Sequence, residues 1–394
     1  MKPRRSRLIF HILCFLSIFF SCSVNAQSPK LKLGAEQTEE YLPILKGKKV
    51  ALIINQTSTL GKNNTHLLDT LLSEGIQVTT IFAPEHGFRG NADAGEIIKD
   101  GKDVKTGIPI ISLYGKNKKP SAQQLSNIDI LVFDIQDVGA RFYTYISTMF
   151  YAMQAASENG KMFMVLDRPN PNDYVDGPML NPRFKSFVGA LPLPVLHGLT
   201  VGELALMIEG ERWVENKGDD WLKVVKMSNW QHGQPYSLPI KPSPNLPNDQ
   251  SIRLYPALCL FEGTNISVGR GTHFPFQVVG YPSKNLGEFF FTPVAMVGSD
   301  KNPLQKDKLC YGLDLRLNQD IKGFDLSTIL YFKENWPATA GPLITRSSFF
   351  DLLAGTDELR KQINQGMTQD EIRQTWEKDL EEYRKTRGKY LLYK

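Results

Sequence analysis

The fold is decided by the stretch Ile81-Phe82-Ala83-Pro84-Glu85-His86-Gly87-Phe88-Arg89-Gly90, in which a strand-like apolar run stops abruptly and a carboxylate, an imidazole and a guanidinium follow. The same pattern recurs: apolar runs over 50–54, 128–133 and 162–166 each end in polar residues. Such runs, separated by amphipathic stretches, predict parallel strands joined by helices. Because the carboxyl ends of neighbouring parallel strands border one crevice, we expect these polar residues to converge there.

This alternation predicts an α/β fold: a Rossmann-like parallel-sheet domain over residues 27–235, followed by a smaller mixed α+β domain over 236–394. We place the boundary in the stretch 231–248, which is rich in Pro, Asn and Ser, because each proline removes a backbone donor. We expect the active site in the cleft between the domains. No G-x-G-x-x-G follows the first apolar run, so neither NAD nor FAD is expected.

Individual helices and strands can also be predicted. Leucines at helical spacing indicate a helix over 64–74, and capping boxes that begin at Thr200 and Thr368 indicate two more. In the second half, the runs over 289–297 and 312–317 predict strands, with two helices after them.

Residues 1–26 have the pattern of a signal peptide. Four basic residues precede an apolar run over 8–20, and Val24-Asn25-Ala26 is a small-residue cleavage signature. That run is short for a membrane span, and no later segment supplies about 20 consecutive apolar residues. We therefore expect an exported protein, periplasmic or extracellular, without a transmembrane span in the mature chain. Cys22 leaves open a lipid-anchored, lipoprotein form.

Charge and cysteine content narrow the class further. The 394 residues carry a formal charge of +5, and removing the four basic residues of the leader leaves +1. A nearly neutral chain without a Lys/Arg tract gives no indication of nucleic-acid binding. Cys259 and Cys310 remain outside the leader, and they could form a disulfide or stay as two buried thiols. Oligomeric state is left open.

Glu85 and His86 are the first catalytic candidates. A carboxylic acid held in a Pro-Glu-His-Gly turn can donate a proton to a leaving oxygen if burial raises its pKa. Glu85 could instead cap the next helix or pair with Arg89. Glu262, in the glycine-rich loop 259–272, is the candidate for a second carboxylate, because most glycoside hydrolases use a pair.

The segment 134–145 combines carboxylates, amides and aromatic rings, the mixture that carbohydrate sites need. Arg141 could hold a substrate carboxylate, or form an internal salt bridge with Asp134 or Asp137. His197, standing alone, is more often a structural histidine. The candidate substrate-binding residues are Asn55, Arg89, Asp134, Gln136, Asp137, Arg141, Tyr143, Asp167, Arg168, Asn170, His197 and Asn265.

The sequence lacks the motifs of several other kinds of active site. The sequence has neither H-E-x-x-H nor a Cys/His cluster, so we expect no zinc site and no metal or organic cofactor. It also lacks a G-x-S-x-G elbow, which weakens an esterase interpretation.

Together the motifs resemble the NamZ-type exo-β-N-acetylmuramidases. The similar segments are 84–90, 134–145, 167–171, 197–200 and 261–265, and the resemblance runs from about residue 47 to residue 393. It implies a Rossmann-like domain joined to a smaller α/β domain, with the site in the cleft between them. It also implies release of N-acetylmuramic acid from the non-reducing end of peptidoglycan fragments, in cell-wall turnover or recycling.

The resemblance further implies roles for particular residues. Glu85 would be the general acid/base, and Glu262 the second carboxylate or a sugar-orienting residue. Because N-acetylmuramic acid carries a lactyl carboxylate, a cation is needed, and Arg141 and Arg168 are the candidates. Two other functions stay open: a non-catalytic muropeptide- or sugar-binding protein that uses the same cleft, and an amidase or esterase acting on cell-wall substituents.

Overall fold

The computed structural model describes residues 30–89, 100–215, 218 and 220–394. The predicted leader over 1–26, with Cys22, lies outside the described residues. Residues 31–394 form one compact unit. Within the described ranges, no helix has both the length and the apolar character needed to cross a membrane.

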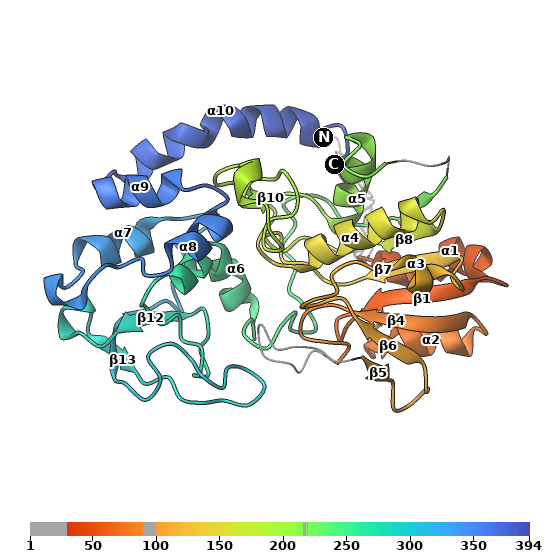
Figure 1. Ribbon diagram of the computed structural model, residues 1–394, viewed down its shortest axis with the longest axis horizontal. Coiled ribbons are helices and arrows are strands. Elements are labelled where there is room, and N and C mark those ends of the chain that lie inside the picture. Colours follow the sequence, from red (N-terminus) through yellow and green to blue (C-terminus); the bar gives the residue numbers. More distant parts are fainter. Residues whose placement is uncertain (1–29, 90–99, 216–217, 219) are drawn as a thin grey trace, which may run out of the picture. The chain divides into compact units, whose positions relative to one another are not determined.

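A mostly parallel sheet is built from strands that lie between residues 49 and 225 (Figure 1). Over the described residues its seven strands lie in the order β11 (Leu222–Val225), β8 (Met162–Leu166), β7 (Ile130–Asp134), β1 (Lys49–Ile54), β4 (Gln77–Ala83), β6 (Pro109–Ser112) and β5 (Gly101–Lys102). The four predicted apolar runs are the neighbouring parallel strands β8, β7, β1 and β4. The α/β sheet is therefore confirmed. Among the described strands of this sheet, only β5, at one edge, pairs antiparallel with its neighbour.

Helices cover both faces of this sheet, because successive side chains of a strand point to opposite faces. Val50 and Leu52 lie in the apolar cluster of one face, whereas Ala51 and Ile53 lie in the cluster of the other. The first cluster includes side chains of α1 (Thr38–Leu45) and α2 (Leu67–Ser73), and the second those of α3 (Ala122–Leu125), α4 (Tyr145–Glu158) and α5 (Val201–Gly210). Burial on both faces explains why the strands are continuous apolar runs.

The predicted helix caps are largely confirmed. Thr200 and Thr368 form the expected capping boxes at the starts of α5 and of α10 (Gln369–Arg387). The predicted first helix is shorter than expected, because Thr65–His66 form β3, which pairs with β2 (Thr59–Leu60). The helix α2 then begins at Leu67, with the His66 side chain as its cap.

A smaller second part follows the irregular stretch 231–248. It begins with α6 (Asp249–Leu258) and contains a three-stranded antiparallel sheet in the order β12 (Val278–Tyr281), β14 (Cys310–Asp314) and β13 (Phe289–Phe291). Both predicted strands exist, although β13 ends six residues earlier than expected. The prediction of two helices after them is wrong, because the described chain has four: α7 (Ser327–Glu334), α8 (Ser347–Ala354), α9 (Glu358–Gln365) and α10.

Several shorter elements complete the described fold. They are η1 (Gly34–Glu36), β9 (Val175–Asp176), η2 (Pro182–Phe184), β10 (Leu196–His197), η3 (Cys259–Gly263), η4 (Lys284–Leu286) and η5 (Ala338–Ala340). One apolar cluster contains residues of α4 and α5 together with residues of α6 to α10. The domain boundary at residue 235 stays a prediction. Cys259 and Cys310 are both free and buried, the second of the two predicted alternatives.

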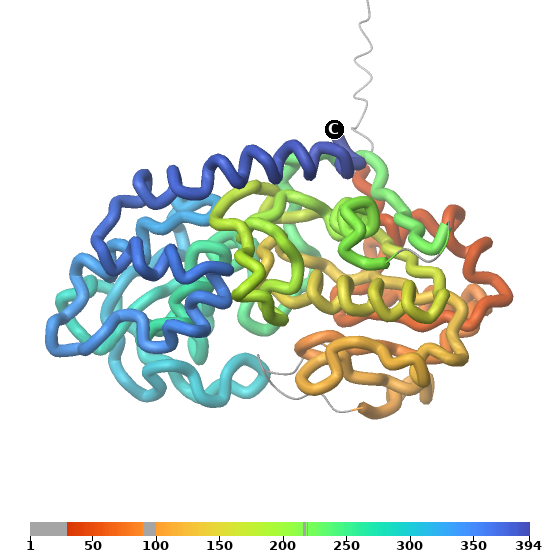
Figure 2. Tube along the Cα trace, turned by 45° about the horizontal axis from the view of Figure 1, so that its top comes forward, coloured from red at the N-terminus to blue at the C-terminus, as the bar shows by residue number. Residues whose placement is uncertain are grey.

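The C-terminal helix returns the chain to the parallel sheet. Figures 1 and 2 show α10 running from beside α9 towards α5. Tyr383 Oη donates to the His197 carbonyl at 2.8 Å, and Tyr393 Oη donates to Asp167 Oδ2 at 2.6 Å. The end of the chain is therefore anchored at the carboxyl end of β8.

Candidate active site

A pocket of about 540 Å³ lies where the sheet loops meet the second part of the chain. The loops that follow β4, β6 and β7 form one side of it. The other side comes from the irregular segment before α6, from α6 and η3, and from the region of α8. Residues far apart in sequence therefore share one concave site.

Glu85 is placed in this pocket by the turn that ends β4. Strand pairing stops after Ala83, because Pro84 has no backbone donor, and the Gly87 N–H donates to the Pro84 carbonyl at 3.0 Å to close the turn. Thr144 Oγ1 donates to Glu85 Oε2 at 2.6 Å. A residue at the start of α4 thus orients the carboxylate.

His86 follows in the same turn and also lines the pocket. It is buried, and its backbone has a φ of 68°, with Gly87 at 77°. A left-handed conformation is costly for a residue with a Cβ, and such strain is concentrated at functional sites. The turn therefore carries backbone strain at a position that lines the pocket.

Aromatic rings form the inner wall. Tyr143 makes edge contacts with Tyr145 and Tyr255, at centroid distances of 4.8 and 5.7 Å, and Tyr255 makes one with Phe276 at 5.0 Å. Burial raises the pKa of Tyr145, so its phenol keeps its proton. Burial also raises the pKa of the neighbouring Cys259 thiol, which makes that cysteine a poor nucleophile.

Tyr114, Lys118 and Phe187 line another part of the pocket. Phe187 stacks on Tyr151 with an interplanar angle of 11°, and Lys118 Nζ lies 4.9 Å from the Phe187 ring centroid. Burial, together with the nearby Glu85 carboxylate, raises the pKa of Tyr114. The pocket thus presents an aromatic surface and a cation on the same side as Glu85.

Glu262 brings a second carboxylate to the pocket from η3. Arg270 Nε donates to Glu262 Oε1 at 2.8 Å, and Arg270 Nη2 donates to the same oxygen. The Glu262 side chain is 21% exposed and the Arg270 side chain 18%. This partly buried pair fixes Glu262 and brings a cation into the site.

The structure separates the predicted site residues into two groups. Glu85, His86, Tyr143 and Glu262 line one pocket. The other predicted residues do not line it: Asn55, Arg89, Asp134, Gln136, Asp137, Arg141, Asp167, Arg168, Asn170, His197 and Asn265.

The crevice at the ends of β1 and β7 is covered by the protein itself. Gln56 Nε2 donates to the carbonyls of Lys241 and Pro242, and Tyr145 Oη donates to Pro242 at 3.0 Å. Asn55 Oδ1 accepts hydrogen bonds from the Thr57 N–H and from Thr57 Oγ1. In the same region, Gln136 Nε2 donates to the carbonyls of Asp137 and Pro169 at 2.8 and 2.7 Å. The hydrogen bonds of Gln56 and Tyr145 tie the proline-rich segment to the loop after β1 and to the start of α4.

Arg141 and Arg168 lie outside the pocket, so the structure does not support their assignment to the lactyl carboxylate. Arg141 is fully buried and donates to three carbonyls, those of Pro178, Leu193 and Leu353. Neither alternative salt bridge of Arg141 is found among the described residues. Asp134 pairs with Arg168, whose Nη2 lies 2.9 Å from Asp134 Oδ2. Asp137 Oδ2 lies 3.7 Å from His197 Nε2.

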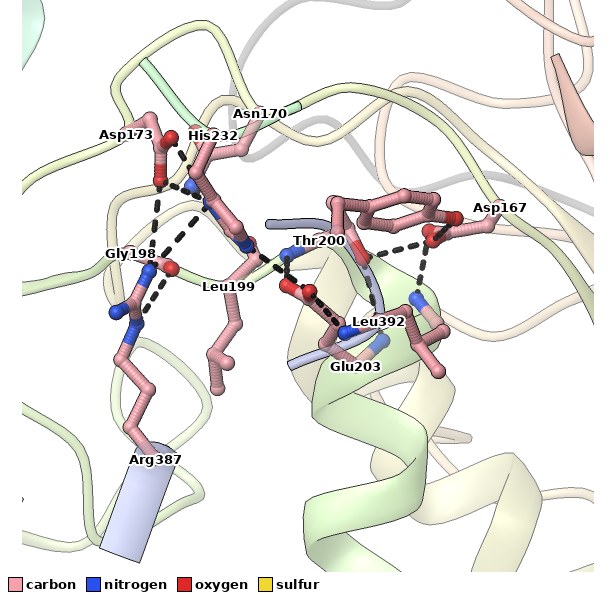
Figure 3. A network of polar contacts seen from close by, with 12 residues as sticks. Asp167, Asn170, Asp173, Gly198, Leu199, Thr200, Glu203, His232, Arg387 and Leu392 are labelled. Carbon is pink, nitrogen blue, oxygen red and sulfur yellow. Dashed lines mark hydrogen bonds and ion pairs between the residues drawn. The ribbon is translucent and has the colours of Figure 1, made fainter. Parts of the chain in front are cut away.

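Asp167 and Asn170 belong to an internal polar network (Figure 3). Asp167 accepts hydrogen bonds from Thr200 Oγ1 at 2.8 Å and from the Gly202 N–H at 2.7 Å. Asn170 Nδ2 donates to the Leu199 carbonyl at 3.0 Å. These groups hold the start of α5 against the end of β8.

The remaining predicted residues also have internal contacts. His197 Nδ1 accepts from the Leu199 N–H at 3.2 Å, and its Nε2 lies 3.7 Å from Asp137 Oδ2, as expected for a structural histidine. Arg89 pairs with Asp103 at 2.6 Å. Asn265 Oδ1 accepts from Thr345 Oγ1 at 3.3 Å.

The sequence reasoning did not select five notable lining residues: Tyr114, Lys118, Phe187, Arg270 and Arg346. Arg270 had a usable signal, since it stands between Gly269 and Gly271 in the glycine-rich loop, and both glycines have left-handed φ values, 78° and 76°. The other four lie outside any motif. Among the described residues, no group of three or more His, Cys, Asp or Glu is placed to hold a metal ion.

Comparison with known proteins gives consistent matches over most of the chain. The family model described as exo-β-N-acetylmuramidase NamZ, N-terminal, matches residues 50–250, and its C-terminal counterpart matches residues 253–393. The peptidoglycan β-N-acetylmuramidase NamZ of Bacillus subtilis (strain 168) is 42% identical over 395 residues, which cover 94% of this chain and 93% of that protein.

Two solved structures also match this chain over most of its length. A DUF1343 family protein from Bacteroides fragilis NCTC 9343 superposes with a TM-score of 0.82 at 45% identity, covering 93% of this chain and 99% of the other. A second DUF1343 family protein from the same organism gives a TM-score of 0.79 at 32% identity, covering 92% and 99%.

A pair of carboxylates is typical of the catalytic site of glycoside hydrolases. Here two carboxylates lie in one pocket with several aromatic rings. Together with matches to both halves of the chain, they identify its class as a glycosidase on an α/β scaffold. The chain belongs to the exo-β-N-acetylmuramidase NamZ family.

Proposed function

We propose that this protein is an exo-acting β-N-acetylmuramidase that releases N-acetylmuramic acid from the non-reducing end of peptidoglycan fragments. The observation that carries the proposal is the position of Glu85 in the pocket, with Oε2 held by Thr144 at 2.6 Å. A fixed carboxyl group in a partly desolvated pocket is the group that protonates a glycosidic oxygen.

In the proposed reaction, Glu85 is the general acid. Its proton passes to the glycosidic oxygen as the bond from that oxygen to C1 breaks, and the electron pair leaves with the departing sugar. Positive charge then develops at C1 in an oxocarbenium-like transition state. Water supplies the new oxygen at C1, and the proton lost by that water restores the acid.

Glu262 is the proposed second carboxylate. Its pairing with Arg270 through Oε1 holds the side chain in one orientation. A carboxylate in this position can stabilise positive charge at C1 or orient a sugar hydroxyl. The anomeric configuration of the first-formed product, read by NMR, separates retention from inversion.

The biological setting is also part of the proposal. We propose that the protein is exported and acts in cell-wall turnover, because the signal-peptide pattern over 1–26 would place it where peptidoglycan fragments occur. The proposed partner is therefore a peptidoglycan-derived glycan.

The test is product analysis on a peptide-free glycan that carries N-acetylmuramic acid at its non-reducing end. Stepwise appearance of the free monosaccharide supports exo cleavage. Internal fragments would contradict exo action, and release of acetate or peptide without a free sugar would indicate an amidase or esterase. Tight binding without any product would indicate a sugar-binding protein.

A further inference from the structure

A second hollow of about 330 Å³ adjoins the active-site pocket and shares three lining residues with it: Glu262, Arg270 and Arg346. The shared wall therefore carries two guanidinium groups and one carboxylate. Since Arg270 already pairs with Glu262, this arrangement leaves an excess of positive charge where the two hollows meet. Asp300 lines the second hollow only.

Arg270 has unused capacity to bind an anion. Its Nε and Nη2 donate to Glu262, whereas its Nη1 is buried and has no hydrogen-bond partner among the described residues. A buried donor without a partner is unfavourable, and a ligand acceptor would satisfy it. The Arg270 guanidinium also lies 5.1 Å from the Phe276 ring centroid, so its plane is held in place.

Arg346 approaches the same point from the start of α8. Its Nη1 donates to the Glu262 carbonyl at 3.4 Å, and its guanidinium lies 4.6 Å from the ring centroid of Phe349, another pocket residue. The two arginines thus contact the same glutamate, one through its side chain and one through its backbone. Guanidinium groups suit carboxylates because their donors form a planar fork.

We propose that Arg270 and Arg346 together bind the lactyl carboxylate of the terminal N-acetylmuramic acid. This inference rests on the proposed function and deepens it by naming the residues that determine specificity. N-Acetylglucosamine lacks the lactyl group, and an amide-linked stem peptide replaces the carboxylate by a neutral amide. The arginines therefore favour a muramic acid with a free carboxylate over both alternatives.

Lys118 is the rival cation, because it also lines the pocket. A second alternative is that the arginines are purely structural, with Arg270 serving only to hold Glu262. These alternatives differ in how substitutions change the preference between a carboxylate ligand and its amide. The preference is the ratio of the affinities, or of the kcat/KM values, that one protein has for the two ligands. A general loss of folding or activity therefore leaves it unchanged.

The experiment measures binding of N-acetylmuramic acid and of its lactyl methylamide by titration calorimetry to the full chain. It also measures kcat/KM on the MurNAc-GlcNAc disaccharide and on its lactyl methylamide. The variants are Arg346→Met, Arg346→Lys, Arg270→Lys and Lys118→Met. Arg316→Met is the matched control, because Arg316 also lies over a phenylalanine ring, that of Phe274 at 4.4 Å, and lines neither hollow.

We expect the wild type to prefer the carboxylate form by about tenfold to a hundredfold, the range of a charge-assisted hydrogen bond. Arg346→Met should remove most of this preference by weakening only the carboxylate form, and Arg346→Lys should restore part of it. Arg270→Lys keeps a charge beside Glu262 but loses the fork, so it should lower the preference. Arg316→Met should retain it.

The proposal is overturned if the preference survives in Arg346→Met and Arg270→Lys, or if Lys118→Met alone abolishes it. It is also overturned if the wild type binds the acid and the amide equally. If the wild type cleaves neither disaccharide but binds the acid through both arginines, the proposed hydrolase function fails, whereas the carboxylate receptor is supported.

Discussion

Thr144 Oγ1 donates a 2.6 Å hydrogen bond to Glu85 Oε2, joining the first residue before α4 to the turn that ends β4. Thr144 occupies the N-cap position, yet its side chain makes no capping hydrogen bond to the helix. The hydroxyl group is thus directed to Glu85 in place of the backbone. This contact fixes the orientation of the Glu85 carboxyl group.

Replacing Thr144 by valine should lower kcat on the MurNAc-GlcNAc disaccharide by about tenfold, with little change in KM, since a misoriented acid weakens transition-state stabilisation. Stability should change little, because no cap is lost. Thr144→Ser is the control and should keep most of the activity. Wild-type kcat in Thr144→Val would show that this hydrogen bond does not position the acid.

The sequence predicted the parallel sheet well because its strands are buried on both faces. Residues 50–54 and 162–166 are recognisable without any tertiary information, since continuous apolar runs are rare in half-exposed strands. The Glu85 turn was equally visible, as proline and glycine mark its limits. Strand β11, with three half-buried residues out of four, carries a much weaker pattern.

The remainder of the site depends on tertiary contacts that local sequence does not encode. Arg141 stands in the densest polar segment, but its partners are carbonyls 37, 52 and 212 residues away. A buried structural arginine and a ligand-binding arginine look alike in sequence. Arg346 is the reverse case, because it stands outside any motif and reaches the pocket only through the packing of α8.

Arg141→Met tests the structural role of this arginine. It removes hydrogen bonds to three buried carbonyls, so the free energy of unfolding should fall by at least about 3 kcal/mol. Urea denaturation measures this change, and the exposed Arg183→Met serves as the matched control with little effect. KM of the folded variant should stay near the wild-type value. A stable Arg141→Met with a strongly raised KM would instead make Arg141 a substrate ligand.

His232 makes stability depend on pH. Burial alone would lower its pKa, but hydrogen bonds to Asp173 and Glu203, both 2.9 Å long, outweigh that effect and raise the pKa to about 9 (Figure 3). Below pH 6.5 the imidazole is protonated in both states, so the pairing stabilises the fold fully. That contribution is lost as pH rises through about 9.

The corresponding measurement compares the free energy of unfolding at pH 6 and pH 9.5 for the wild type and His232→Asn. The cost of the substitution should be up to about 3 kcal/mol greater at pH 6 than at pH 9.5. His273→Asn is the control, because His273 is exposed, and its cost should be the same at both pH values. An equal cost of His232→Asn at both pH values would show that folding does not raise the pKa of His232.

The most direct test of the account is release of N-acetylmuramic acid from the MurNAc-GlcNAc disaccharide by the wild type and by Glu85→Gln. The amide keeps the shape of the side chain but cannot donate an acid proton, so we predict turnover by the wild type and a loss of at least about a hundredfold in the variant. A folded Glu85→Gln protein that keeps wild-type kcat would contradict the assignment of Glu85 as the general acid.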